Sequence, residues 1–317
     1  METTPDFWLD KPYYSLDAYC KKTFGHKCYK IALNAHMTCP NRDGSLGTRG
    51  CIFCSKGGSG DFAEDFSLQN DINIQLEKGL SRFGDKKTGQ HFIAYFQAYT
   101  NTYAPVSYLE QIYRAALDSE LVCGISIATR PDALPPEVLG LLQSLKQCYP
   151  AKFIWVELGL QTIHEQTAEY IRRGYSLPVY EEAVGKLSDI GIPVITHMII
   201  GLPGETPAML YETVDYLNRH QPFGVKLQLL HVLKDTDLAT EYSLGRFDVL
   251  SMEAYLDLLV DCIERLSPDV VLHRVTGDGP KDMLIAPLWS LNKRNVLNSL
   301  HQKMSREHSR QGKRFEG

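Results

Sequence analysis

Residues 28–54 read CYKIALNAHMTCPNRDGSLGTRGCIFC, a short apolar run followed by a glycine-rich loop that carries three cysteines. The run at 28–34 has the length and composition of a buried β-strand. Cys39, Cys51 and Cys54 follow it, with eleven and then two residues between them. Because parallel α/β folds collect their chemistry at the carboxyl ends of strands, the sequence predicts a functional loop at such an end.

The cysteine spacing favours one shared metal centre. Cys51 and Cys54 are close enough along the chain to bind the same centre, and the glycines of the loop let Cys39 return to it. Three thiolates suit a [4Fe-4S] cluster in which one iron lacks a protein ligand and is open to an exogenous one. A zinc site completed by His36 or His26, and three unrelated cysteines, remain alternatives. The other five cysteines stand singly among apolar residues and are expected to be buried: Cys20, Cys28, Cys123, Cys148 and Cys262.

Apolar runs alternate with amphipathic stretches along most of the chain. Strands are predicted at 28–34, 91–99, 121–129, 153–161, 193–201, 224–232 and 270–275, and helices at 70–83, 107–119, 135–147, 179–190, 207–220 and 251–266. Near-continuously apolar strands joined by helices indicate a parallel sheet covered on both faces. Periodicity alone leaves open a doubly wound sheet and a complete or incomplete β/α barrel.

Composition describes an ordinary globular chain of 317 residues with net charge -5. No apolar run reaches the roughly 18 residues of a membrane helix, and the cysteines are not expected to form disulfides, so a cytoplasmic protein is expected. We predict an N-terminal extension at 1–27, a barrel at 28–290 and a basic C-terminal segment at 291–317. Residues 293–317 hold seven lysines and arginines against two glutamates, and they either contact a polyanion or form a solvated tail.

The cysteine loop and several later blocks resemble the radical SAM (S-adenosylmethionine) superfamily, whose usual triad is Cys-x3-Cys-x2-Cys. The longer first gap is similar to that of the group related to the catalytic subunit of the elongator complex, and within it to the bacterial YtqA/YhcC type, including the MnmL type. This resemblance implies a partial TIM-type parallel β/α barrel of the radical SAM kind. It also implies that Cys39, Cys51 and Cys54 hold a [4Fe-4S] cluster. The cluster would reduce SAM, which breaks into methionine and a 5'-deoxyadenosyl radical that abstracts hydrogen from a substrate.

The resemblance also implies where SAM lies. The usual Gly-Gly-Glu motif is replaced by Gln97-Ala-Tyr-Thr-Asn-Thr, so backbone carbonyls with Gln97, Tyr99 or Thr100 would hold the SAM ammonium. Thr129-Arg-Pro-Asp matches the elongator-like group, and so does Glu157-Leu-Gly-Leu-Gln161, whose polar side chains would reach the ribose and carboxylate. The resemblance assigns the SAM ribose to Gln161 and the SAM carboxylate to Arg173, and Arg172 could take the role of Arg173. The turn at Gly201 would lie on the adenine side of SAM. Alternatively, Glu157 forms an ion pair with an arginine inside the barrel.

Four polar residues on the last two strands are candidates for the substrate pocket, because strand alternation would direct them into the barrel mouth: Lys226, His231, His273 and Arg274.

The basic tail and the elongator-like resemblance together favour tRNA as the partner. The likeness to the MnmL type implies conversion of a 5-carboxymethylaminomethyl group on wobble uridine to 5-aminomethyl, with a flavodoxin- or ferredoxin-type protein as reductant. A radical enzyme acting on a small metabolite and a non-catalytic, zinc-stabilised RNA-binding protein remain alternatives.

Overall fold

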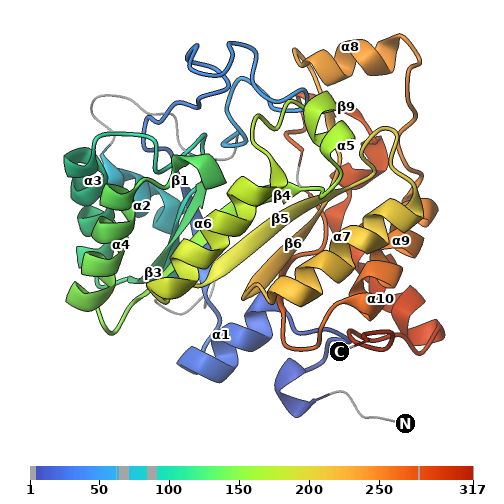
Figure 1. Ribbon diagram of the computed structural model, residues 1–317. Helices are drawn as coiled ribbons and strands as arrows, with labels where there is room; N and C mark the ends of the chain where they lie inside the picture. Colours follow the sequence, from blue (N-terminus) through green and yellow to red (C-terminus); the bar gives the residue numbers. More distant parts are fainter. Residues whose placement is uncertain (1–4, 62, 64–70, 84–90, 278, 317) are drawn as a thin grey trace.

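The centre of the molecule is a curled sheet of seven parallel strands (Figure 1). The computed structural model describes residues 5–61, 63, 71–83, 91–277 and 279–316. Each strand pairs with the next, in the order β1-β2-β3-β4-β5-β6-β8, and the sheet curls into a half-barrel. The strands are β1 (Tyr29–Leu33), β2 (Phe92–Phe96), β3 (Val122–Thr129), β4 (Phe153–Gln161), β5 (Val194–Ile200), β6 (Gly224–Leu229) and β8 (Val271–Arg274). All seven predicted strands and the partial TIM-type barrel are confirmed.

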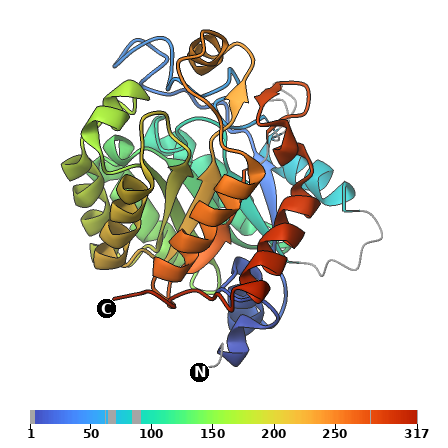
Figure 2. The ribbon, with the colours of Figure 1, turned by 90° about the vertical axis from the view of Figure 1, so that its right-hand side faces the viewer.

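Six helices cover the outer face of this sheet, as Figures 1 and 2 show. Their apolar sides pack on the strands and form the largest hydrophobic core. Ser251 caps α9 through a bond from the Ala254 amide, as expected for a hydroxyl at a helix N-terminus. The helices are α2 (Ile72–Ser81), α3 (Val106–Asp118), α4 (Pro136–Cys148), α6 (Leu177–Asp189), α7 (Pro207–His220) and α9 (Met252–Arg265). They agree with the predicted helices within a few residues, although Asn70, at one predicted end, lies outside the described residues.

Shorter elements that were not predicted gather at the carboxyl ends of the strands, at the top of Figure 1. They are α5 (Glu165–Tyr170), α8 (Asp237–Ser243), and β7 (Val232–Leu233) paired antiparallel with β9 (Leu284–Ala286). The loop between β1 and α2 carries the three cysteines and lies beside α8, where the Leu238 amide donates to the carbonyl of Ile52. No described helix is both long and apolar enough to cross a membrane.

The opposite end of the half-barrel is filled by aromatic and cysteine side chains. The Sγ atoms of Cys28 and Cys123 are 3.6 Å apart, and Cys20 packs in the same small core with Trp155. The prediction that these three cysteines stand singly is wrong, because residues distant in sequence meet at the start of the barrel strands. Cys148 is exposed, so its predicted burial is also wrong.

Both terminal segments lie against this closed end, far from the cysteine loop (Figures 1 and 2). Helix α1 (Leu16–Phe24) follows Ser15, which bridges Leu272 of β8. Helix α10 (Lys293–Arg306) packs on α9 through Val296, Leu300 and Met304.

Part of the positive charge of the tail is directed at acidic residues of α9. Lys303 pairs with Asp257 at 2.6 Å, Lys313 with Glu264 at 3.1 Å, and Arg314 with Asp261 and Glu264 at 2.8 and 2.6 Å. These contacts satisfy three of the seven basic residues within the fold. The composition of the tail is therefore no evidence, by itself, for a nucleic-acid surface.

Gln311 ties the C-terminal segment to the N-terminal one. Its fully buried amide donates to the carbonyls of Ser267 (2.6 Å) and Val270 (2.8 Å) and accepts from the Tyr14 amide (2.9 Å). We expect Gln311→Ala to lower the free energy of unfolding by about 3 kcal/mol, because three buried backbone groups lose their partner. Urea denaturation would measure the loss, and the exposed Gln302→Ala serves as matched control. Equal midpoints for the two variants would contradict the prediction.

Candidate active site

One arginine braces the cysteine loop from within. Arg42 Nη2 donates to the carbonyls of Cys54 (2.9 Å) and Ser55 (2.6 Å). Gly50 has φ +74°, and a Cβ atom there would lie 2.9 Å from the Arg42 guanidinium. The backbone therefore requires glycine at position 50 if the arginine is to brace the loop.

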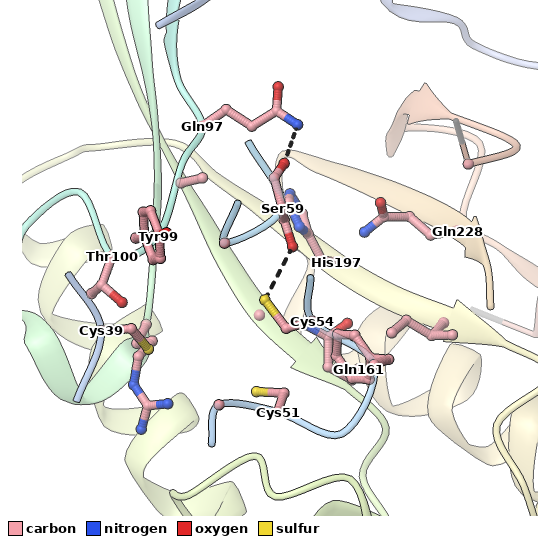
Figure 3. A pocket seen from close by; sticks show the side chains of 18 of the residues that line it. Cys39, Cys51, Cys54, Ser59, Gln97, Tyr99, Thr100, Gln161, His197 and Gln228 are labelled. Carbon is pink, nitrogen blue, oxygen red and sulfur yellow. Dashed lines mark hydrogen bonds between the residues drawn. The ribbon is translucent and has the colours of Figure 1, made fainter. Parts of the chain in front are cut away.

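The three predicted cysteines line one cavity, where Figure 3 shows their sulfur atoms gathered on one side. All three are free thiols of intermediate exposure. Cys54 Sγ lies 3.8 Å from Ser59 Oγ, and Asn41 Nδ2 donates to Cys51 Sγ at 3.5 Å. Burial, with Cys54 and Cys39 beside it, raises the pKa of Cys51 to about 12. A bound cation would displace that proton, because metal ligation selects the thiolate.

An upper level of the cavity consists of residues at the ends of β2, β3 and β4, next to the cysteines. Gln97 Nε2 donates to the Ser59 carbonyl at 2.6 Å, and the Tyr99 hydroxyl donates to the Lys56 carbonyl. Gln161, with φ +65°, ends β4 and lines the same cavity. Its Oε1 is buried without a hydrogen-bond partner in the described part of the chain. An unpaired buried acceptor beside a cavity fits a ligand that donates a hydrogen bond.

Two threonines complete this level. Thr100, in the segment that follows β2, lines the cavity. Thr129 ends β3, and its Oγ1 lies 2.5 Å from Thr102 Oγ1. Next to it Arg130 also lines the cavity and forms an ion pair with Asp132 at 2.7 Å.

The two adjacent arginines serve the fold around the cavity. Arg173 lines the wall, but its buried guanidinium donates to the carbonyls of Leu160, Thr162 and Tyr175 at 2.7–3.1 Å and contacts Glu165 at 3.2 Å. A role with the SAM carboxylate would require some of these bonds to be exchanged. Arg172 does not line the cavity and instead pairs with Asp237 of α8 at 2.6 Å.

Gly201 also lies outside the residues that line the cavity. It has φ +91°, and a Cβ atom there would approach Leu250 Cδ1 to 3.0 Å. Glycine is thus required here by the backbone and by packing.

A lower level of the cavity surrounds Glu157, in the middle of β4. Its fully buried carboxylate contacts Lys30 Nζ (2.6 Å), His197 Nε2 (2.7 Å), Ser126 Oγ (2.5 Å) and Lys226 Nζ. Glu157 does form an ion pair inside the barrel, as the alternative prediction had it, but its partners are Lys30 and Lys226 and not an arginine. Two cations around one carboxylate keep Glu157 ionised.

The pKa values of this cluster follow from burial and from the two lysines. Burial alone would raise the pKa of Glu157, but Lys226, Lys30 and His197 outweigh burial and hold that pKa well below its usual range. Burial and Lys226 together lower the pKa of His197 to about 4. Near neutral pH the cluster therefore holds an ionised Glu157 and an uncharged His197.

The substrate-pocket candidates are distributed over different depths. Arg274 and His231 line the cavity, and His231 Nε2 lies 3.1 Å from Ser290 Oγ. Lys226 lies behind the lining, bonded to Glu157 and to the Tyr95 hydroxyl. The structure does not bring His273 to the cavity. Its ring packs at the closed end, with its centroid 5.3 and 5.5 Å from those of Trp155 and Phe223.

Sequence reasoning missed several cavity residues. Tyr95, His197 and Gln228 line the cavity, and so do Ser59 and Arg130. Gln228 follows Lys226 by two residues, so alternation along β6 was a usable signal for it. His197 was visible as a polar residue within an apolar strand, but its partner on β4 was not.

The positions of the histidines and cysteines do not favour the alternative of a zinc site. No three His, Cys, Asp or Glu side chains in the described ranges are placed to hold a single metal ion. His36 is exposed with φ +53°, and His26 Nδ1 lies 3.8 Å from Cys28 Sγ, at the other end of the half-barrel. Neither histidine lines the cavity that Cys39, Cys51 and Cys54 share.

A half-barrel with three cysteines in the loop after its first strand defines the class of the protein, and the sequence comparisons agree. Residues 45–217 match the Radical SAM superfamily and residues 222–306 match the Radical_SAM C-terminal domain, so the chain belongs to the radical SAM superfamily.

Among individual relatives, the chain is 42% identical over 307 residues to YtqA of Bacillus subtilis (strain 168), covering 97% of this chain and 94% of YtqA. It is 28% identical over 186 residues to the tRNA uridine(34) acetyltransferase of Dehalococcoides mccartyi (strain CBDB1), covering 57% of this chain and 39% of that protein. The structure of archaeal Methanocaldococcus infernus Elp3 shares the fold with a TM-score of 0.68 at 17% identity, covering 90% of this chain and 64% of that one. The predicted likeness to YtqA-type and elongator-related proteins is confirmed.

Proposed function

We propose that Cys39, Cys51 and Cys54 hold a [4Fe-4S] cluster and that SAM binds beside it in the upper level of the cavity. Three free thiols facing one cavity, with the unpaired Oε1 of Gln161 nearby, are the observation that carries this proposal. When bound, the cluster and SAM would supply a 5'-deoxyadenosyl radical. A reductant of flavodoxin or ferredoxin type is expected as partner.

The residues of the chain would bind and enclose the cofactor. Gln161 Oε1 would accept a hydrogen bond from a ribose hydroxyl, and the carbonyls and side chains of the segment from Gln97 to Thr100 would receive the ammonium. Thr129, at the end of β3, and Arg130, in the turn after it, line the same level of the cavity. The cysteine loop and α8 would limit the access of water to the reacting atoms.

Gln161→Ala is expected to weaken SAM binding about tenfold, because one hydrogen bond to a buried acceptor contributes on the order of 1.4 kcal/mol. Equilibrium dialysis with reconstituted protein would measure the dissociation constant. The exposed Gln143→Ala provides a matched control. Unchanged affinity in Gln161→Ala would remove this residue from the SAM site.

The substrate that we propose is the wobble uridine of tRNA, whose 5-carboxymethylaminomethyl group would be converted to 5-aminomethyl. Support comes from the similarity to a tRNA uridine(34) acetyltransferase and from the polar side chains that line the cavity, among them Gln228 and Arg274, which suit a polar base.

The test is anaerobic incubation of reduced, reconstituted enzyme with SAM and tRNA that carries the carboxymethylaminomethyl group, followed by nucleoside mass analysis. We expect the aminomethyl nucleoside to appear only when SAM is present. SAM cleavage with an unchanged wobble nucleoside would contradict the tRNA assignment and favour a small-metabolite substrate.

A further inference from the structure

The cavity has two levels that differ in depth along β4. Gln161 lies at the end of the strand near the cysteines, and Glu157 precedes it by four residues. At about 3.3 Å per residue, the two Cα atoms are about 13 Å apart along the strand. A cofactor held beside Cys39, Cys51, Cys54 and Gln161 therefore leaves the lower level to the substrate.

His197 both lines the cavity and is oriented by a hydrogen bond to Glu157. It lines the cavity from β5, as Figure 3 shows, and its Nε2 lies 2.7 Å from Glu157 Oε2. Because Lys30 and Lys226 keep that carboxylate ionised, Nε2 carries the proton and donates it. The uncharged ring then has an unprotonated Nδ1, and no described residue forms a hydrogen bond with that atom.

Lys226 is a poorer candidate for contact with the substrate. Its side chain is 3% exposed, and its amine is bonded to Glu157 and to the Tyr95 hydroxyl. It does not belong to the cavity lining. Its role is to fix the charge of Glu157, and through Glu157 the tautomer of His197.

We infer that His197 is a catalytic residue whose Nδ1 accepts a proton from a substrate N–H group next to the carbon that loses hydrogen. This inference rests on the proposed function and deepens it, because the side-chain amine of the proposed uridine is such a group. The donor is the protonated form of that amine, whose N–H becomes more acidic once the neighbouring carbon has lost hydrogen. The proton moves from the ammonium nitrogen to Nδ1, the electron pair of the broken N–H bond stays on nitrogen and leaves a neutral amine, and the resulting imidazolium is paired with Glu157 at 2.7 Å. The charged or titratable groups facing the ring are Glu157 from β4, Lys226 from β6 and Arg274 from β8.

His197→Gln tests the inference, since glutamine keeps a hydrogen-bonding side chain of similar size but cannot take up a proton. We expect the amount of product formed per 5'-deoxyadenosine to fall about 100-fold, as for the loss of a general base. Binding of a fluorescent anticodon stem-loop to the SAM-loaded, unreduced enzyme should change less than about twofold. His220→Gln, outside the barrel, is the matched control. Unchanged product per 5'-deoxyadenosine in His197→Gln would overturn the assignment.

Nitrogen NMR of histidine-labelled holoprotein supplies a readout that does not depend on turnover. With His197→Gln used to assign the signal, we expect at pH 7.5 an unprotonated Nδ1 and a protonated Nε2, and a change in this tautomer in Glu157→Gln. A protonated Nδ1 at that pH would overturn the inference even if the enzyme is active. If wild-type enzyme cleaves SAM but leaves the wobble nucleoside unchanged, the tRNA proposal fails while the NMR result still decides the state of His197.

Discussion

Cys54→Ala is expected to abolish SAM cleavage, with no 5'-deoxyadenosine above background after reduction. Cys39, Cys51 and Cys54 face one cavity, and the proposed cluster needs all three thiolates because one of its irons is already without a protein ligand. The variant should also lose most of its iron and its brown colour. Iron and sulfide analysis together with chromatography of the reaction products would measure both effects.

The matched control is Cys148→Ala, which removes an exposed thiol outside the cavity. It should retain iron and SAM cleavage at the level of the wild type. Because Cys54 lies in a surface loop braced by Arg42, the fold of Cys54→Ala is expected to persist, which circular dichroism would verify. A Cys54→Ala protein that still cleaves SAM would contradict the assignment of the cluster ligands.

Glu157→Gln is expected to destabilise the protein by about 3–5 kcal/mol, which is typical when one partner of a buried ion pair is removed. The substitution leaves Lys30 and Lys226 inside the half-barrel without a carboxylate. Urea denaturation would measure the loss, and the exposed Glu169→Gln serves as control. The double variant Glu157→Gln/Lys226→Met should lose less free energy of unfolding than the two single variants lose together. The reason is that it removes one of the two lysine charges that Glu157→Gln leaves unpaired. Additive losses would contradict the coupling.

The pH dependence of this contribution follows from the direction of the pKa shift. The pKa of Glu157 is lowered on folding, so the stabilisation is present above the pKa of an unfolded glutamate and is lost as the pH falls through the lower folded value. The difference in stability between wild type and Glu157→Gln should therefore persist from pH 8 to pH 5. Its disappearance already at pH 6 would contradict an ionised Glu157.

The strands were predictable because most of their residues are apolar and buried, as in β2, where all five residues are buried. The run at 153–161 agrees with β4 at both ends. Short elements such as α5 and α8 span too few residues for a helical period to show.

The site residues that lie in one stretch of sequence, such as the three cysteines of the loop, were predictable. The contacts between side chains from different strands were not. The partners of Glu157 come from β1, β3, β5 and β6, so their meeting depends on strand register. A register shift between β6 and β8 pairs Lys226 with Arg274 and leaves His273 at the closed end. Alternation alone could not reveal that shift.

The most direct test of the central claim is electron paramagnetic resonance of the anaerobically purified protein after reduction, recorded with and without SAM. We expect a brown protein with a [4Fe-4S] signal that changes when SAM is added, because one iron is open to an exogenous ligand. A colourless protein that holds one zinc ion per chain after anaerobic reconstitution with iron and sulfide would contradict it and favour a zinc-stabilised binding protein.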